Sequence, residues 1–336
     1  MLTTSLLAGA CGPGESGCPS PDELAAVEIA FIRTHEDGRR ELRGASLDGS
    51  DVPLLCAGGS ATRPEFVLGW SADGADLAIV ESVDDESWVS VVRPGDREPA
   101  RIGPGHEGRW SPVGRSLAFL AARDHEVHEL RVWDGVTRLL AVGALRTISW
   151  GPDGARLLTH VERDTEGGLS AGTHRLALDG TSERLETGEY PEWSPDGRLL
   201  VYSGPADEVW ILHTHDLETG EIRPLGSVGP LIPGRDPRWS FDGGLVAVGM
   251  SEFDCVHPRC QSVGVLSREG SGGLVVARGT TDFAWSPGDT RIVVAEPTDG
   301  DLGPKRLHVR RGTGDEVVAP AADDAPWSDA QPAWRP

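Results

Sequence analysis

A tryptophan-headed turn motif recurs along this 336-residue chain and limits its fold more than any other feature. Its fullest copy, residues 193–197, reads Trp-Ser-Pro-Asp-Gly, and altered copies stand elsewhere at a regular interval. The seven tryptophans at the head of these copies are Trp70, Trp110, Trp150, Trp193, Trp239, Trp285 and Trp334. Neighbouring tryptophans are 40 to 49 residues apart. That period is typical of one four-stranded blade of a β-propeller.

The residues of the motif suit a tight turn between two strands. Pro presets φ at the second turn position, Asp tolerates the bend, and Gly supplies a positive φ. Apolar runs follow the turn, for example residues 199–202 and 245–248. We expect these runs to be strands covered on both faces, as blades packed between two neighbours require. The indole before each turn is then placed to fill the space between adjacent blades.

The first and last repeats are incomplete in complementary ways. Residues 27–57 contain three strand-like segments with no motif ahead of them, whereas residues 331–334 form an inner strand with nothing after it. Joined, they make one blade, which would close the ring. Because 44 Gly and 25 Pro residues interrupt any long helix, the sequence predicts an all-β fold. We expect a seven-bladed β-propeller of four-stranded antiparallel blades, closed by N- and C-terminal strands that share one blade, with six blades as the alternative.

The motif and the residues before it resemble the TolB-type propeller repeat. Before two of the tryptophans the chain reads Asp-Pro-Arg (236–238) and Gln-Pro-Ala (331–333). The resemblance covers nearly all of residues 24–336, and it is specific because the seven copies share one phase. TolB proteins combine a six-bladed propeller with an N-terminal α/β domain in the periplasm. The resemblance implies a related propeller of the bacterial cell envelope, and we expect this chain to lack the α/β domain and to have one more blade.

The N-terminal residues read like the end of a secretion signal. An apolar stretch that ends in small residues precedes Cys11, and residues 7–11 resemble a bacterial lipobox, whose cysteine receives a diacylglycerol anchor. We therefore expect Cys11 to be lipidated, and an ordinary disordered terminus with a chance cysteine is the alternative. The expected division of the chain is a signal-peptide remnant (1–10), a flexible tether (11–23) and the propeller (24–336).

The cysteine count fits an oxidising compartment. There are five cysteines, and assigning Cys11 to lipid leaves four. Cys255 and Cys260 enclose a short loop that two strand ends could bring within disulfide range. Cys18 and Cys56 would then tie the N-terminal arm to the first β-rich segment. Because such disulfides persist only outside the cytosol, we expect a periplasmic or outer-membrane-associated protein.

The sequence carries no set of residues arranged for catalysis. The Gly-x-Ser-x-Gly match at 168–172 lacks a strand before it and a helix after it, so we interpret it as a loop. His213 and His215 share one strand face and could hold a metal, but we expect them to be solvated or packed. A metal site on His257 and its two neighbouring cysteines would lack a fourth ligand. We predict that the chain is not an enzyme and has no cofactor.

The charge balance excludes one class of partner. Lys and Arg number 31 against 53 Asp and Glu, which gives a formal net charge of -22. A chain of this charge repels a phosphate backbone, so we expect no nucleic-acid partner. No apolar run approaches the roughly 18 residues of a membrane span. Membrane contact would therefore come only through the lipid on Cys11.

Long polar connections between the second and third strands of four blades offer a binding surface. They cover residues 162–172, 203–208, 251–261 and 296–305. Because each occupies the same place in its blade, all four emerge on one rim of the ring, where binding residues gather in many folds. The residues that we predict to bind a partner there are Asp164, Glu166, Glu252, Phe253, Asp254, His257, Asp299 and Asp301. Their carboxylates could also hold calcium, and a merely solvated acidic rim is the alternative.

Three functional hypotheses follow from these features. We favour a non-catalytic, lipid-anchored and monomeric scaffold that binds other envelope proteins or peptides. The first alternative is a metal-dependent propeller hydrolase of the lactonase type, with its active site at the central channel. The second is a purely structural surface protein. A propeller fold alone does not decide among them.

Overall fold

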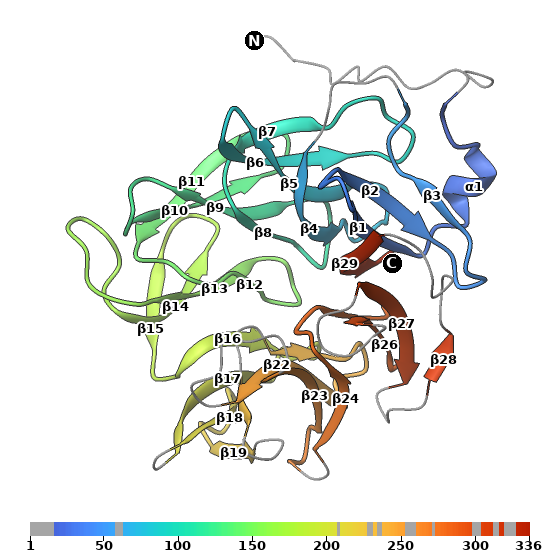
Figure 1. The fold of residues 1–336 in the computed structure, drawn as a ribbon. Helices are drawn as coiled ribbons and strands as arrows, with labels where there is room; N and C mark the ends of the chain where they lie inside the picture. Colours follow the sequence, from blue (N-terminus) through green and yellow to red (C-terminus); the bar gives the residue numbers. More distant parts are fainter. Residues whose placement is uncertain are drawn as a thin grey trace.

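Seven antiparallel sheets arranged in a ring make up the described part of the chain (Figure 1). The computed structural model describes residues 17–57, 63–206, 209–226, 231–233, 237–252, 260–270, 273–297, 304–311, 316–318 and 327–336. Among these residues the only α-helix is α1 (Pro21–Ala25). In the described residues, no helix has the length and apolar character needed to cross a membrane. The predicted all-β, seven-bladed propeller is confirmed.

The first four blades run from an inner to an outer strand. Blade 1 contains β29 (Trp327–Trp334), β1 (Ile29–His35), β2 (Arg40–Ala45) and β3 (Asp51–Pro53). Blade 2 contains β4 (Pro64–Trp70), β5 (Leu77–Val83), β6 (Glu86–Val92) and β7 (Ala100–Pro104). Blade 3 contains β8 (Glu107–Trp110), β9 (Leu117–Ala122), β10 (His128–Trp133) and β11 (Thr137–Gly143). Blade 4 contains β12 (Ser149–Trp150), β13 (Arg156–Val161), β14 (Gly172–Ala177) and β15 (Ser182–Leu185).

The remaining three blades follow the same order, with one variation. Blade 5 contains β16 (Glu189–Trp193), β17 (Leu199–Ala206), β18 (Val209–Asp216) and β19 (Ile222–Gly226). Blade 6 contains β20 (Leu231–Pro233), β21 (Arg238–Trp239), β22 (Leu245–Glu252), β23 (Gln261–Ser267) and β24 (Leu274–Arg278). Blade 7 contains β25 (Phe283–Trp285), β26 (Arg291–Pro297), β27 (Lys305–Arg311) and β28 (Glu316–Val318). In blade 6, β20 and β21 both pair with β22, so two short strands share the inner position.

The two ends of the propeller meet in blade 1. The C-terminal strand β29 pairs antiparallel with β1, in a register that sets Ile29 opposite Trp334 and His35 opposite Trp327. Figure 1 shows this meeting as the dark red strand beside the blue sheet. The closure predicted from the complementary incomplete repeats is therefore present. It leaves no blade without its inner strand, because the strand missing at the start of the chain is supplied by its end.

In blades 2, 5 and 6 the turn after the motif tryptophan is held by side chains of the motif itself. In blade 5 the Ser194 hydroxyl donates to Asp196 Oδ1 over 2.6 Å and accepts from the backbone N–H of Leu199 over 2.8 Å. Gly197 has a φ of 71°, in the left-handed region that glycine tolerates best. Ser240 and Asp242 make the same hydroxyl-to-carboxylate bond in blade 6. The serine hydroxyl thus accepts a hydrogen bond from the first backbone N–H of the second strand. We had not predicted this role from the sequence.

The hydrophobic core is divided into clusters that lie between neighbouring blades. One cluster joins Ile29 and Phe31 of blade 1 to Val293 and Leu307 of blade 7. Others join blade 1 to blade 2, blade 3 to blade 4, and blade 5 to blade 6. The apolar strand runs are therefore covered on both faces, as predicted.

The motif tryptophans also link the blades by hydrogen bonds. In five blades the indole Nε1 donates to the carbonyl oxygen of the residue before the preceding blade's tryptophan, over 2.9 to 3.3 Å. These pairs are Trp70 with Ala333, Trp110 with Gly69, Trp150 with Arg109, Trp285 with Arg238, and Trp334 with Ala284. The buried Nε1 atoms of Trp193 in blade 5 and Trp239 in blade 6 have no hydrogen-bond partner in the described structure.

The N-terminal segment is fastened to the propeller. A disulfide joins Cys18 to Cys56, the pairing that the sequence suggested. Helix α1 follows at Pro21, so the last residues of the predicted tether are helical. Residues 1–16, including Cys11, lie outside the described residues, and the signal remnant and lipidation stay predictions.

Candidate functional site

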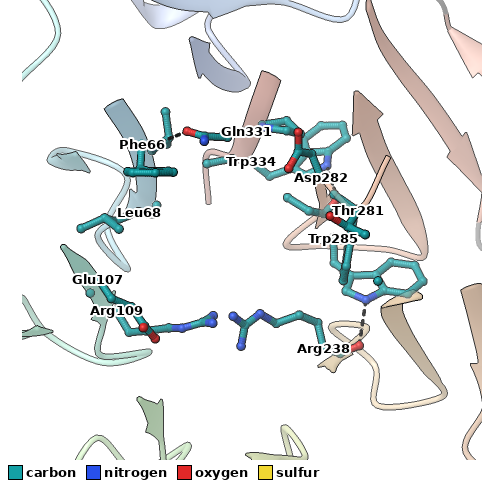
Figure 2. Close-up of a pocket in the computed structure, with 18 of the residues that line it drawn as sticks. Phe66, Leu68, Glu107, Arg109, Arg238, Thr281, Asp282, Trp285, Gln331 and Trp334 are labelled. Atoms are coloured by element: carbon teal, nitrogen blue, oxygen red, sulfur yellow. Dashed lines mark hydrogen bonds between the residues drawn. The ribbon is translucent and has the colours of Figure 1, made fainter. Parts of the chain in front are cut away.

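A cavity of about 990 Å³ lies where the inner strands converge on the propeller axis (Figure 2). Its walls come from the inner strands β4, β8, β21, β25 and β29, with further residues from β22 and β23. The alternative hypothesis of a hydrolase placed an active site in this channel, but the sequence did not indicate which residues line it.

The cavity reaches the face of the ring that carries the second-to-third-strand connections. Each inner strand begins at that face and ends at the motif turn on the opposite face, because adjacent strands are antiparallel. Glu107 and Asp282, at the starts of their inner strands, line the cavity together with Gln261, where β23 begins after such a connection. The cavity therefore reaches the face that carries the predicted rim, which we call the connection face. Because Trp239, Trp285 and Trp334 also line it, the cavity extends along the inner strands toward the opposite side, the turn face.

One side of the cavity is apolar and lined partly by small residues. Phe66 and Leu68 of β4 point into it (Figure 2), and the Phe66 residue is 45% exposed. Gly69, Ala284 and Ala333 continue this wall. An aromatic ring left this open in a concave site is available to an apolar ligand group.

The opposite side carries Arg109 and Arg238, which stand at one repeated position. The residue before the motif tryptophan is charged in blades 3, 5 and 6 and small in the others. Around the ring from blade 2 to blade 1 the set is Gly69, Arg109, Ser149, Glu192, Arg238, Ala284 and Ala333. Arg238 Nη1 and Glu192 Oε2 form an ion pair over 3.1 Å. Figure 2 shows the Arg109 and Arg238 side chains extending toward one another across the cavity. This set could have been found in the sequence, because each member directly precedes a motif tryptophan, but our sequence analysis did not identify it.

Polar groups of blades 1 and 7 complete the lining. Asp282 forms an ion pair with Lys305 over 3.3 Å, between Asp282 Oδ2 and Lys305 Nζ. Gln331 Oε1 accepts a hydrogen bond from the backbone N–H of Val67 over 3.2 Å. Gln331 has a φ of 54°, and Tyr190, at the equivalent position of blade 5, has a φ of 52°. A positive φ is unfavourable for such side chains, and in both blades it accompanies a register shift of the inner strand.

Histidines gather near the connection face of blades 3 and 4. The rings of His106 and His128 lie 5.1 Å apart, edge to face. Burial, and to a smaller extent the nearby His106 and Arg146, lowers the pKa of His128. Burial also lowers the pKa of His160 in β13. These imidazoles are therefore favoured in the neutral form in the folded protein.

The described residues offer little for metal or nucleophile chemistry. No group of three His, Cys, Asp or Glu side chains within them is arranged to hold a metal. The His213 ring stacks on Tyr202 with centroids 5.4 Å apart. The Gly-x-Ser-x-Gly match at 168–172 is a loop that leads directly into β14, as we interpreted it.

The predicted rim is only partly described. Asp164 and Glu166 are exposed on the connection between β13 and β14, where Asp164 Oδ1 accepts from the backbone N–H of Ala171 over 2.6 Å. Glu252 is the last residue of β22. Cys260 is disulfide-bonded. The remaining residues of the prediction lie outside the described part: Phe253, Asp254, Cys255, His257, Asp299 and Asp301.

One of the predicted connections is wrong. Residues 203–206 belong to β17, which pairs with β18 as far as Ala206 opposite Val209. The polar and small residues there had suggested a loop. A strand forms instead because this hairpin extends its ladder beyond the apolar run, which leaves only residues 207–208 between the two strands.

Comparisons with known proteins agree with the fold. No protein-family profile matches the chain. An uncharacterized protein of Agrobacterium fabrum is 26% identical over 223 residues, which cover 59% of this chain and 74% of that protein. Among solved structures, TolB from Acinetobacter baumannii is similar with a TM-score of 0.52 and 17% identity, over 92% of this chain and 67% of that chain.

Other solved propellers are equally similar. A TolB candidate from Agrobacterium tumefaciens has a TM-score of 0.52 and 18% identity, over 85% of this chain and 98% of its own. An oligogalacturonate lyase in complex with manganese has a TM-score of 0.55 and 13% identity, over 87% of this chain and 84% of that chain. At these identities the similarity demonstrates a shared fold, and it includes both TolB proteins and an enzyme.

Proposed function

We propose that this chain is a non-catalytic scaffold of the bacterial cell envelope, which holds another protein or a peptide against its connection face. The observation that carries the proposal is the axial cavity, in which an apolar wall faces a charged one. Such a lining suits recognition, because apolar contacts supply affinity and a few charges fix orientation. The structural similarity to TolB proteins supports the same assignment.

The Cys18–Cys56 disulfide supports an envelope location. Structural disulfides persist in oxidising compartments such as the periplasm and are rare in the cytosol. The lipobox-like segment before Cys11 would add a membrane anchor to the same N-terminal arm. Lipid anchoring, a monomeric state and the acidic rim all belong to this proposal.

Two phenylalanines provide a direct test of the binding face. Phe66 lies in the cavity and Phe241 in a motif turn on the turn face, and they are 45% and 62% exposed. Each can be replaced by a photoreactive phenylalanine analogue with little change in shape. We expect irradiation of intact cells to link a partner protein through position 66 and not through position 241. Crosslinks formed only at position 241 would contradict the proposed face.

A propeller hydrolase is the second candidate, since the cavity lies on the axis where such an active site was expected. It would need a metal held partly by residues outside the described ranges. Metal analysis of the purified protein, together with ester and lactone hydrolysis assays, distinguishes the two. Stoichiometric metal with hydrolysis that is lost on chelation would favour the enzyme.

A further inference from the structure

Two arginines are directed at one another across the axial cavity. Arg109 of β8 and Arg238 of β21 both line it, and in Figure 2 their side chains approach end to end from opposite walls. Two guanidinium groups directed together present N–H donors to one point in a concave site, in a chain whose net charge is -22. A carboxylate between the two guanidinium groups would accept hydrogen bonds from both.

The backbone at each arginine is held by a hydrogen bond from the motif tryptophan of the next blade. The carbonyl oxygen of Arg109 accepts from Trp150 Nε1 over 2.9 Å, and that of Arg238 accepts from Trp285 Nε1 over 3.0 Å. Glu192 orients the Arg238 guanidinium through its ion pair. Because a guanidinium has five N–H donors, Arg238 can hold Glu192 and still donate to a ligand. The pair is therefore preorganised, which lowers the entropy cost of binding.

The rest of the lining suits a ligand that has an apolar group and N–H donors as well as a carboxylate. Phe66 and Leu68 stand on the wall next to Arg109 (Figure 2) and would cover an apolar side chain. Glu107, Asp282 and Gln331 bring oxygen acceptors to the same cavity. A peptide has a backbone N–H donor at nearly every residue, whereas a simple fatty or aromatic acid has none.

The acidic groups near the arginines limit the charge of the ligand. Glu107 lines the cavity, and Glu192 pairs with Arg238. Because these carboxylates offset the two guanidinium charges, the site has no excess of positive charge for a multiply charged phosphate and suits a singly charged carboxylate better.

From these observations we infer that the axial cavity binds the free C-terminal carboxylate of a peptide or protein segment with an apolar final residue. Arg109 and Arg238 hold the carboxylate, and Phe66 and Leu68 contact the final side chain. The inference rests on the proposed scaffold function and names the chemistry that its cavity recognises.

A matched pair of peptide pools tests the inference. One pool contains short peptides with free C-termini and apolar or small final residues, and the other contains the same sequences amidated. Binding is read from the fluorescence of Trp239, Trp285 and Trp334, which line the cavity, and from calorimetry. We expect the free-acid pool to bind, and amidation to weaken binding about 10- to 100-fold, as expected for loss of hydrogen bonds to a charged group.

Variants of the two arginines identify the site. Arg109→Gln and Arg238→Gln should each weaken the free-acid pool by a similar factor and leave the amidated pool unchanged. Arg238→Lys keeps the charge but loses the planar set of guanidinium donors, so its affinity should lie between those of the wild type and Arg238→Gln. Arg198→Gln is the matched control, because Arg198 pairs with Asp216 outside the cavity. Thermal unfolding of each variant shows whether it is folded.

The outcomes separate this inference from the scaffold proposal. Equal binding of both pools, no binding of either, or folded arginine variants with unchanged affinity would each overturn the inference. If position 66 still forms crosslinks in those cases, the scaffold proposal stands alone. If free-acid peptides bind through the arginines while crosslinks form only at position 241, the scaffold face is wrong and the carboxylate site stands.

Discussion

Each motif indole packs between two blades, but only some indoles also donate a hydrogen bond across the interface. Trp150 and Trp193 make the comparison clear, because they are 7% and 8% exposed and occupy the same position in neighbouring blades. Trp150 Nε1 donates to the Arg109 carbonyl, whereas Trp193 Nε1 has no partner in the described structure. Burying an unpaired N–H is unfavourable, so the Trp193 indole contributes by packing alone.

Replacing these two tryptophans by phenylalanine separates packing from hydrogen bonding. Both substitutions remove similar apolar volume, but Trp150→Phe also leaves the Arg109 carbonyl without its donor. We expect Trp150→Phe to lower the free energy of unfolding by about 1–3 kcal/mol more than Trp193→Phe. Urea unfolding followed by circular dichroism measures the difference. Equal losses would mean that the indole hydrogen bonds add nothing to the stability of the ring.

At the scale of an element, strand β29 closes the ring by pairing with β1. Its Trp334 is buried at the interface of blades 1 and 7 and donates to the Ala284 carbonyl over 3.0 Å. Trp334→Ala should therefore lower the free energy of unfolding by about 3–5 kcal/mol, as in other large-to-small core substitutions. Phe241→Ala, on an exposed turn, is the control and should change it by about 0.5 kcal/mol or less. A small effect at Trp334 would show that the ring does not depend on this closure.

The histidines on β10 and β13 should make stability depend on pH. The folded-state pKa values of His128 and His160 are lowered, mainly by burial, so below about pH 6.5 the unfolded chain binds more protons than the folded one. Stability should be full at pH 7.5 and fall as the pH drops toward 5.5. The double substitution His128→Gln and His160→Gln should flatten this dependence. Carboxylates such as Asp48 and Asp216, with pKa values of about 2, change the pH dependence of stability only at lower pH, where they become protonated. A wild-type melting temperature that is constant over this window would contradict the assignment.

At the scale of the whole molecule, the sequence predicted the architecture well and the site poorly, for a physical reason. The tryptophan period and the split first blade are local patterns repeated along the chain, so they indicated the ring and its closure directly. The cavity depends on residues of different blades that meet only at the axis, such as Arg109 and Arg238, 129 positions apart in the numbering. No spacing rule links them. The signal that remained, one charged residue before some tryptophans, has meaning only once the ring is formed.

The N-terminal arm decides how the whole propeller would sit at a membrane. The Cys18–Cys56 disulfide fixes the arm to blade 1, and the seven residue-to-residue steps from Cys11 to Cys18 can span at most about 25 Å. A lipid on Cys11 would therefore hold the propeller close to the bilayer. Expressed behind an established lipoprotein signal, the protein should fractionate with membranes, and Cys11→Ser behind a cleavable secretion signal should move it to the soluble periplasmic fraction. Cys18→Ser is the control: it loosens the arm without removing the lipid and should stay with the membranes. Recovery of the Cys11-containing protein in the soluble fraction, with no lipid in its mass spectrum, would contradict the anchor.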